Sequence, residues 1–131
     1  MSKVKVTFAI YGDEFNINNV SEILNLSPSK TRIKGVTPPG GKIPSPTTGW
    51  SLSTEYEDSH DVMDQINNLS STLKRKTSEL KKIKKIYDVK YVFMLSIKIE
   101  DGKAPGFHLD GELLSFVNEI DAAIDLDMYI L

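Results

Sequence analysis

The sequence predicts an α+β fold, a two-layer sandwich in which a mixed, mostly antiparallel five-stranded sheet carries helices on one face. Segments of alternating apolar and polar residues occur at both ends and in the centre of the 131-residue chain, as expected for strands. Between them lie stretches with apolar residues at spacings of three, four and seven, which are typical of amphipathic helices. The resulting order is β-α-β-β-α-β-α-β. Its beginning is typical of a split βαβ unit, so we expect the topology to be partly ferredoxin-like.

The first half of the chain predicts three strands and one short helix. Residues 3–10 alternate between polar and apolar side chains, which indicates a half-buried strand. Asn19 followed by Glu22 is a capping-box pattern and predicts the start of the helix. A brief second strand is expected within residues 30–36, and a third within residues 50–57.

The second half predicts one long helical stretch, the strongest strand, a last helix and a last strand. The apolar stripe from Val62 to Ile83 follows Asp58 and Ser59, either of which can cap a helix. Unbroken, this helix would overhang a domain of this size, so we expect a kink or break at residues 74–78. Residues 89–99 predict a central strand with one wholly apolar face.

The C-terminal segment completes the predicted sheet. Asp110 is the expected cap of the last helix, and the final strand alternates apolar residues with Asp125 and Asp127. These two carboxylates share one face of the strand, as acid/base or metal chemistry sometimes requires. Because lysines of other strands should share that face, we interpret both as members of surface ion pairs.

The stretch from Gly35 to Trp50 is the most unusual part of the sequence. It holds four of the six prolines and the only tryptophan, and it is longer than a tight hairpin requires. Pro39-Gly40 fits the central positions of a type II turn, because proline presets the first φ and glycine supplies a positive second one. Trp50 is expected in the core, with exposure as a binding anchor as the alternative.

Composition and charge exclude several classes of function. The 40% hydrophobic and 26% charged residues are ordinary for a globular protein, so we expect a single domain, 1–131, with no membrane contact. The absence of cysteine fits a cytoplasmic location. A net charge of −2 gives no field that would recruit nucleic acid. Seven basic residues and one acid lie between Lys74 and Lys85, which we interpret as a solvated helix face.

No catalytic, metal or cofactor motif is present in the sequence. His60 and His108 lack the spacing of a helical metal pair, and no nucleophile elbow or phosphate loop occurs. We therefore expect no enzyme activity, no metal and no cofactor.

Three stretches together resemble a known bacterial family. They are "NVSEILNLSPSKTRIKG", "TGWSLS" and above all "PGFHLDGELLSFVNEIDAAIDLDMYIL". With the whole pattern around them, they make the chain similar to the proteins grouped as domain of unknown function 4279. This resemblance implies a small cytoplasmic bacterial protein without an established activity. An association of some relatives with polymorphic toxins suggests an immunity role and a toxin-like protein partner.

Two functional hypotheses follow. The first is a non-catalytic protein-binding domain, in its narrower form an immunity protein of a polymorphic toxin system. The alternative is a small-ligand or anion-binding domain that uses the Gly35 to Trp50 loop. The residues assigned to binding are Arg32, Lys34 and Lys42 as cationic groups, Pro39 and Gly40 in the turn, and Trp50 as a stacking wall.

Overall fold

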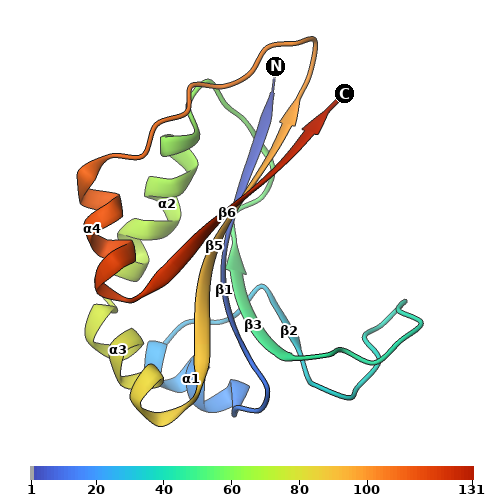
Figure 1. Cartoon of the computed structure of the whole chain (residues 1–131), viewed down its shortest axis with the longest axis vertical. Coiled ribbons are helices and arrows are strands. Elements are labelled where there is room, and N and C mark those ends of the chain that lie inside the picture. The colour runs from blue at the N-terminus through green and yellow to red at the C-terminus, as the bar shows by residue number, and fades with distance from the viewer. Residues whose placement is uncertain (1) are drawn as a thin grey trace.

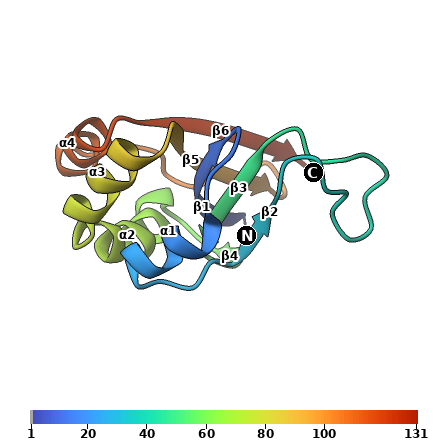
Figure 2. The same cartoon turned by 90° about the horizontal axis from the view of Figure 1, so that it is seen from below.

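The computed structural model describes residues 2–131, which fold into six strands and four helices. The strands are β1 (Lys3–Gly12), β2 (Lys30–Arg32), β3 (Thr48–Ser53), β4 (Glu57–Asp58), β5 (Val89–Ile99) and β6 (Ala122–Ile130). The helices are α1 (Ile17–Leu24), α2 (Val62–Lys74), α3 (Thr77–Ile86) and α4 (Gly111–Glu119). Figures 1 and 2 show all four helices against the same face of the sheet, so the predicted α+β class and its layer arrangement are confirmed.

The sheet has the order β2-β3-β1-β5-β6, and β4 pairs with β1 outside this path. β1 is antiparallel to β3 and β5, and β2 is antiparallel to β3. Because β3 lies between β1 and β2, these two strands and α1 form the split βαβ unit that the start of the sequence suggests. The finer ferredoxin-like likeness stays a prediction. The sole parallel pair among the described strands is β5 with β6, joined through α4.

The expected count of five strands is wrong by one, because residues 57–58 form the short strand β4. Glu57 pairs with Val4 and Asp58 with Lys3, so β4 continues the edge of β1 beyond the end of β3. β3 itself ends at Ser53, earlier than the sequence suggests. The following Thr54 leaves the strand and binds back to β1, since its Oγ1 accepts a hydrogen bond from the Val6 amide at 3.1 Å.

The core lies between the sheet and the helices, and its side chains come from the predicted apolar stripes. The alternating residues of β1 and β5 are buried on the helix side, as is the stripe from Val62 to Ile83 along α2 and α3. Aromatic rings meet at its centre: the Phe8 centroid lies 5.0 Å from that of Phe93 and 5.4 Å from that of Tyr91. β5 is therefore the central strand that its composition predicts.

The long helical stretch is divided in two, as its length requires. α2 ends at Lys74 and α3 begins at Thr77, inside the expected interval of 74–78. The Thr77 hydroxyl donates to the Lys74 carbonyl at 2.7 Å and helps to satisfy the end of α2. Because of this break, α3 changes direction and packs against α1. A single straight helix would not make this contact.

Two of the predicted helix caps are wrong, and both true caps are nearby side chains. α1 is capped by Asn16, whose Oδ1 accepts from the Asn19 amide at 3.0 Å, while the Asn19 side chain donates to the Tyr87 hydroxyl at 2.7 Å. α2 is capped by Asp61, because Asp58 belongs to β4 and Ser59 is buried with its hydroxyl bonded to other groups. The predicted cap of α4, Asp110, is confirmed.

The last strand departs most from expectation. Its apolar residues should complete the core, and Ile124 packs there. Leu126, Met128 and Ile130 are instead 49%, 48% and 78% exposed. Figure 1 shows the cause: β6 leaves the end of α4 and runs past the helix layer, so its second half has no helix over it among the described elements.

None of these four helices is both long and apolar enough to cross a membrane.

Candidate functional site

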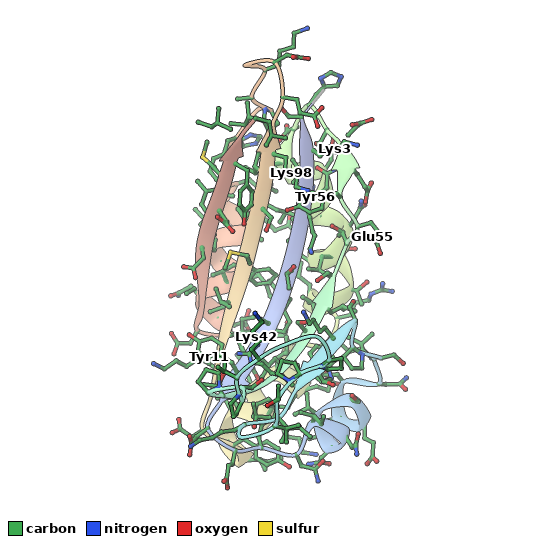
Figure 3. All side chains as sticks on the ribbon, turned by 90° about the vertical axis from the view of Figure 1, so that its right-hand side faces the viewer. Lys3, Tyr11, Lys42, Glu55, Tyr56 and Lys98 are labelled. Atoms are coloured by element: carbon green, nitrogen blue, oxygen red, sulfur yellow. The ribbon has the colours of Figure 1, made fainter. Side chains whose placement is uncertain are left out.

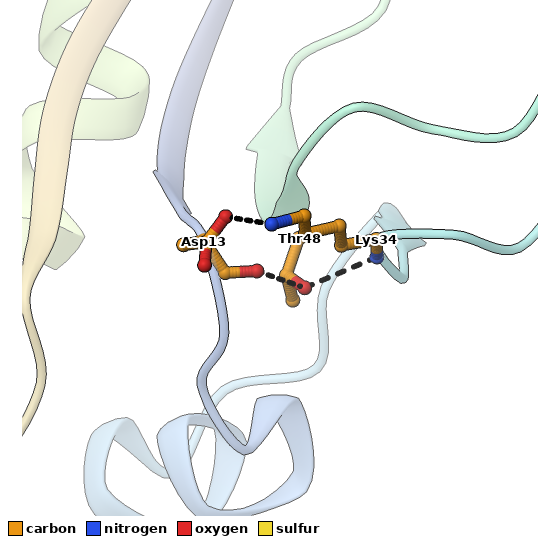
Figure 4. A network of polar contacts seen from close by, with 3 residues as sticks. All are labelled: Asp13, Lys34 and Thr48. Atoms are coloured by element: carbon orange, nitrogen blue, oxygen red, sulfur yellow. Dashed lines mark hydrogen bonds and ion pairs between the residues drawn. The ribbon is translucent and has the colours of Figure 1, made fainter.

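The candidate site is the loop of residues 33–47 that joins β2 to β3 and stands out from the helix-free face of the sheet (Figures 1 and 2). A three-residue network holds its base (Figure 4). The Thr48 hydroxyl donates to the Asp13 carbonyl at 3.2 Å and accepts from the Lys34 amide at 3.2 Å. The Lys34 ammonium also pairs with the Asp13 carboxylate. The hydrogen bond that the Lys34 ammonium donates to the Asp13 carboxylate raises the pKa of Lys34 above its usual value.

The two arms of the loop are tied together above this base. The Gly35 amide donates to the Ser45 carbonyl at 2.9 Å, and the Ser45 amide donates to the Val36 carbonyl at 3.0 Å. Ser45 is buried as a result. Only residues 37–44 therefore form the outer part of the loop, which ordinary backbone bonding keeps in a defined position.

The outer part contains the predicted turn. The Gly41 amide donates to the Pro38 carbonyl at 2.9 Å, and Gly40 has a φ of +78°. Pro39 and Gly40 thus occupy the two central positions of a type II turn, which confirms the prediction made from the Pro-Gly pair.

A surface hollow of about 590 Å³ lies between the outer loop and β2. Its lining comes from both elements: Lys30, Thr31, Arg32, Pro38, Pro39, Gly40, Gly41 and Ser45. Three of the predicted binding residues, Arg32, Pro39 and Gly40, therefore come together there. Lys42 lies exposed on the loop outside this lining (Figure 3), and Lys34 is engaged by Asp13 at the base.

Arg32 is held in place by its neighbours on the sheet. Its Nε and Nη2 donate to the Thr47 hydroxyl at 3.3 and 2.8 Å. Gly49 pairs with Arg32 across β2 and β3, and a Cβ at Gly49 would lie 2.7 Å from the guanidinium carbon. The guanidinium can lie flat over β3 only because residue 49 is glycine.

Trp50 does not belong to this site, and its assignment as a stacking wall has to be corrected. The side chain is 1% exposed and points into the helix layer, which confirms the expectation of a core residue. The reason is the alternation along β3: Gly49 and Ser51 face the loop side of the sheet, so Trp50 faces the helices.

Apolar residues on the loop are the feature that the sequence-based assignment missed. Ile33, Val36 and Ile43 are 51%, 54% and 73% exposed. Each is flanked by polar, proline or glycine residues, and β2, expected within residues 30–36, ends at Arg32, before Ile33 and Val36. This isolation is the signal by which they could have been found.

The helix-free face of the sheet carries a second group of polar side chains (Figure 3). Tyr56 lies over two lysines, with the ammonium groups of Lys98 and Lys5 at 4.1 and 5.3 Å from its ring centroid. Asp125 and Asp127 share this face, as predicted. The predicted pairing with lysine is wrong, because no ion pair to either carboxylate occurs within residues 2–131. Asp127 instead accepts a hydrogen bond from Tyr129 at 2.6 Å.

Three of the seven basic residues in the run 74–85 form ion pairs within the chain. Lys74 pairs with Glu112 at 3.1 Å, Lys81 with Glu119 at 2.9 Å, and Lys84 with Asp121 at 3.6 Å. The basic face of α2 and α3 thus meets the acidic C-terminal region of the same chain. This internal pairing leaves less positive charge for a nucleic acid.

Residues 2–131 include no group of three or more His, Asp or Glu side chains that could hold a metal ion.

The family described as a domain of unknown function (DUF4279) matches residues 2–131. The chain belongs to this family. No curated protein and no solved structure is significantly similar to this DUF4279 domain. The predicted resemblance is therefore confirmed over nearly the whole chain, and the role of the domain has to be argued from its own surfaces.

Proposed function

We propose that this protein is a non-catalytic protein-binding domain and that the 33–47 loop is its binding element. The observation that carries the proposal is Ile43, a large apolar side chain that is 73% exposed on the outer part of a loop tied at its base. Val36 and Ile33 are also exposed on this loop and line one hollow together. Apolar side chains presented on an ordered projection are typical anchors of protein interfaces.

The order of the loop favours binding because it lowers the entropy that a partner must remove. The prolines at 38, 39, 44 and 46 restrict the backbone, and the Gly35, Val36 and Ser45 bonds fix both arms. Ordering a free loop residue costs about 1 to 2 kcal/mol of backbone entropy, and a loop that is already ordered avoids most of that cost. The loop therefore behaves as a preorganised binding element.

Charge indicates the kind of surface that fits the loop. Between Glu22 and Glu55 the sequence has four basic residues and no acid. Lys34 is neutralised by Asp13, which leaves Lys30, Arg32 and Lys42 around the apolar residues. The complementary partner is a protein with an acidic surface and an apolar pocket that accepts Ile43.

The test is capture of partners from the native host with two matched variants. Ile43→Glu replaces the apolar side chain that should enter the partner's pocket with a carboxylate. We expect this variant to lose a partner that the parent retains. Ile86→Glu makes the same change at a side chain that is 49% exposed on α3, and it should retain that partner. A protein captured equally by all three forms would contradict the proposal.

The narrower role is that of an immunity protein that blocks a toxin by covering its surface. It rests on the family-level association with polymorphic toxins. If the protein retained in the capture experiment is toxic when expressed alone and harmless when co-expressed with this chain, the narrower role is supported. Loss of that protection in Ile43→Glu would assign it to the loop.

The 590 Å³ hollow favours a second candidate, an anion-binding domain. Lys30 and Arg32 line it side by side on β2, and no carboxylate is among the lining residues. A small phosphate or carboxylate compound would meet two cations there, one of them a guanidinium suited to bidentate contact. Phosphate or citrate should then raise the melting temperature of the parent and not that of Arg32→Ala. An equal shift in both would exclude the hollow as the site.

A further inference from the structure

The strongest feature outside the loop is the edge strand β6. It is the last strand of the sheet, with β5 on one side and no further strand of residues 2–131 on the other. It is nine residues long and contains no Pro or Lys, which often protect such an edge from pairing, and its charged residues are Asp125 and Asp127. The opposite edge, β2, is only three residues long and carries Lys30 and Arg32. β6 is therefore the longer and less protected edge.

The direction of its free backbone groups follows from one hydrogen bond. The Leu131 amide donates to the Ile99 carbonyl of β5 at 2.9 Å. Since successive residues of a strand turn their backbone groups to opposite sides, the odd-numbered residues bond to β5. The amides and carbonyls of Leu126, Met128 and Ile130 consequently point outward. These residues also carry the exposed apolar side chains of the strand.

We infer that β6 pairs with β6 of a second copy of this chain, antiparallel and with Met128 on the twofold axis. Each copy would then supply outward amides and carbonyls to the other, in hydrogen-bonded pairs at Met128 with Met128 and at Leu126 with Ile130. The three exposed apolar residues of each copy would meet on the helix side of the joined sheet, which removes part of their surface from water.

The charges of the strand select this register. An axis at Leu126 would set Asp125 directly opposite Asp127 of the second copy, and an axis at Asp127 would set that carboxylate opposite itself. Like charges directly opposite each other are destabilising. An axis at Met128 places Asp127 opposite Tyr129 and Asp125 opposite Leu131. An axis at Tyr129 also avoids facing carboxylates but pairs fewer residues of β6, which spans Ala122–Ile130.

The chemistry of the selected pair is already present within one chain. The Tyr129 hydroxyl donates to the Asp127 carboxylate of its own strand at 2.6 Å. Asp127 and Tyr129 of the second copy would form a non-hydrogen-bonded cross-strand pair, in which side chains come closest. The Tyr129 hydroxyl can therefore donate to the Asp127 carboxylate of either copy. Polar side chains would then pair on the helix-free face of the joined sheet, while the apolar side chains meet on the helix side.

Such a dimer joins two sheets into one and leaves the 33–47 loops free. Those loops connect to β2 and β3, at the far edge from β6, so the two loops lie at opposite ends of the joined sheet. The dimer is thus independent of the function proposed for the loop. If both hold, one dimer presents two binding loops and gains avidity on a partner with two sites.

The chain has no cysteine, so single cysteines can report the register directly. Residues opposite each other in a hydrogen-bonded pair have Cα atoms about 5.5 Å apart, within reach of a disulfide. Met128→Cys should therefore form a disulfide dimer under mild oxidation. Leu126→Cys should not, because in this register its own copy in the second chain lies diagonally, beyond about 7 Å.

Light scattering after size exclusion, at concentrations up to the millimolar range, measures the association itself. We expect the parent and Ile86→Lys to form a dimer, and Met128→Lys to remain a folded monomer because two ammonium groups would face each other on the axis. Three results would each overturn the inference: a monomeric parent at every concentration, a dimeric Met128→Lys, or a Leu126→Cys that crosslinks as fast as Met128→Cys. If the parent is monomeric, the alternative partner of the β6 edge is an extended segment of another protein.

Discussion

The indole Nε1 of Trp50 donates a hydrogen bond to the Ser21 hydroxyl at 2.9 Å, and this bond joins the start of β3 to α1. Trp50 stands three residues after the end of the 33–47 loop and two residues after Thr48, which binds Asp13. The loop is therefore anchored at its end by a fully buried aromatic side chain whose polar group is satisfied. Its outer part and its anchor have different roles.

Trp50→Ala should lower the free energy of unfolding by about 3 to 5 kcal/mol, as for other buried aromatic side chains. Ser21→Ala removes this hydrogen bond together with the one that the Ser21 hydroxyl donates to the Ile17 carbonyl at 3.2 Å, and it should cost about 1 kcal/mol. Urea denaturation followed by circular dichroism measures both. Ile43→Ala, on the outer loop, is the control and should change stability by less than about 0.5 kcal/mol. A Trp50→Ala variant as stable as this control would contradict the anchoring role.

Replacing residues 38–43 with a short Gly-Ser turn should change the free energy of unfolding by less than about 1 kcal/mol, since loop-closure entropy varies slowly with length. The replaced segment lies outside the bonds of Gly35, Val36 and Ser45, which stay in place. The same variant should lose any partner that depends on Ile43. A destabilisation as large as that of Trp50→Ala would show that the outer loop supports the fold.

Replacing Lys81, Lys82 and Lys85 with glutamine should leave stability within about 0.5 kcal/mol of the parent, because exposed ion pairs contribute little. Lys81 pairs with Glu119, and both side chains are about half exposed. We also expect the parent to show no tight, salt-sensitive binding to duplex DNA or RNA. If fluorescence anisotropy shows such binding and the triple variant loses it, the basic run of residues 74–85 is a nucleic-acid binding site.

Sequence periodicity identified the elements in which the spacing of apolar residues along one strand or helix is enough to show which face is buried. β1 and β5 each have one wholly apolar face and lie in the middle of the sheet, and α2 and α3 present one apolar stripe to it. Their faces could be assigned before the structure was known. The cap of α1 could not, because Asn16 and Asn19 both have suitable side chains and the choice depends on Tyr87, 68 residues from Asn19.

The exposure of β6 and of the loop residues depends on where the helix layer ends, which no local pattern records. Leu126 and Met128 alternate as well as any core residues do, yet α4 leaves them uncovered. Trp50 shows the converse. A tryptophan beside a Pro/Gly-rich loop suits a binding site by composition, and only the strand register turns it toward the helices.

Ser70→Ala should raise the free energy of unfolding, by about 1 kcal/mol. The Ser70 hydroxyl is buried in α2 and has no hydrogen-bond partner among the described residues, so its burial is uncompensated. Alanine also has the higher helix propensity. Thermal and urea unfolding measure the change, with Ser71→Ala on the exposed side of the same helix as the control. A Ser70→Ala variant less stable than the parent would mean that the hydroxyl has a partner after all.

Stability should fall at alkaline pH because of Tyr91. Its hydroxyl donates to the Leu80 carbonyl at 2.6 Å inside the core, and burial raises the pKa of this phenol well above its usual value near 10. Below that value the phenol is protonated in both states and its contribution to stability is complete. As the pH rises further, the unfolded chain releases the proton while the folded chain retains it, so unfolding becomes more favourable.

Tyr91→Phe isolates this effect from the titration of the lysines. At neutral pH the variant should be less stable than the parent by about 1 kcal/mol, because the bond to Leu80 is lost. Phenylalanine has no proton to release, so the difference should shrink between about pH 8 and about pH 11, and the order of stability can reverse. Urea unfolding of both proteins across this range measures the trend. Two curves that stay parallel would mean that Tyr91 ionises as readily in the folded chain as in the unfolded one, which its buried bond to Leu80 should prevent.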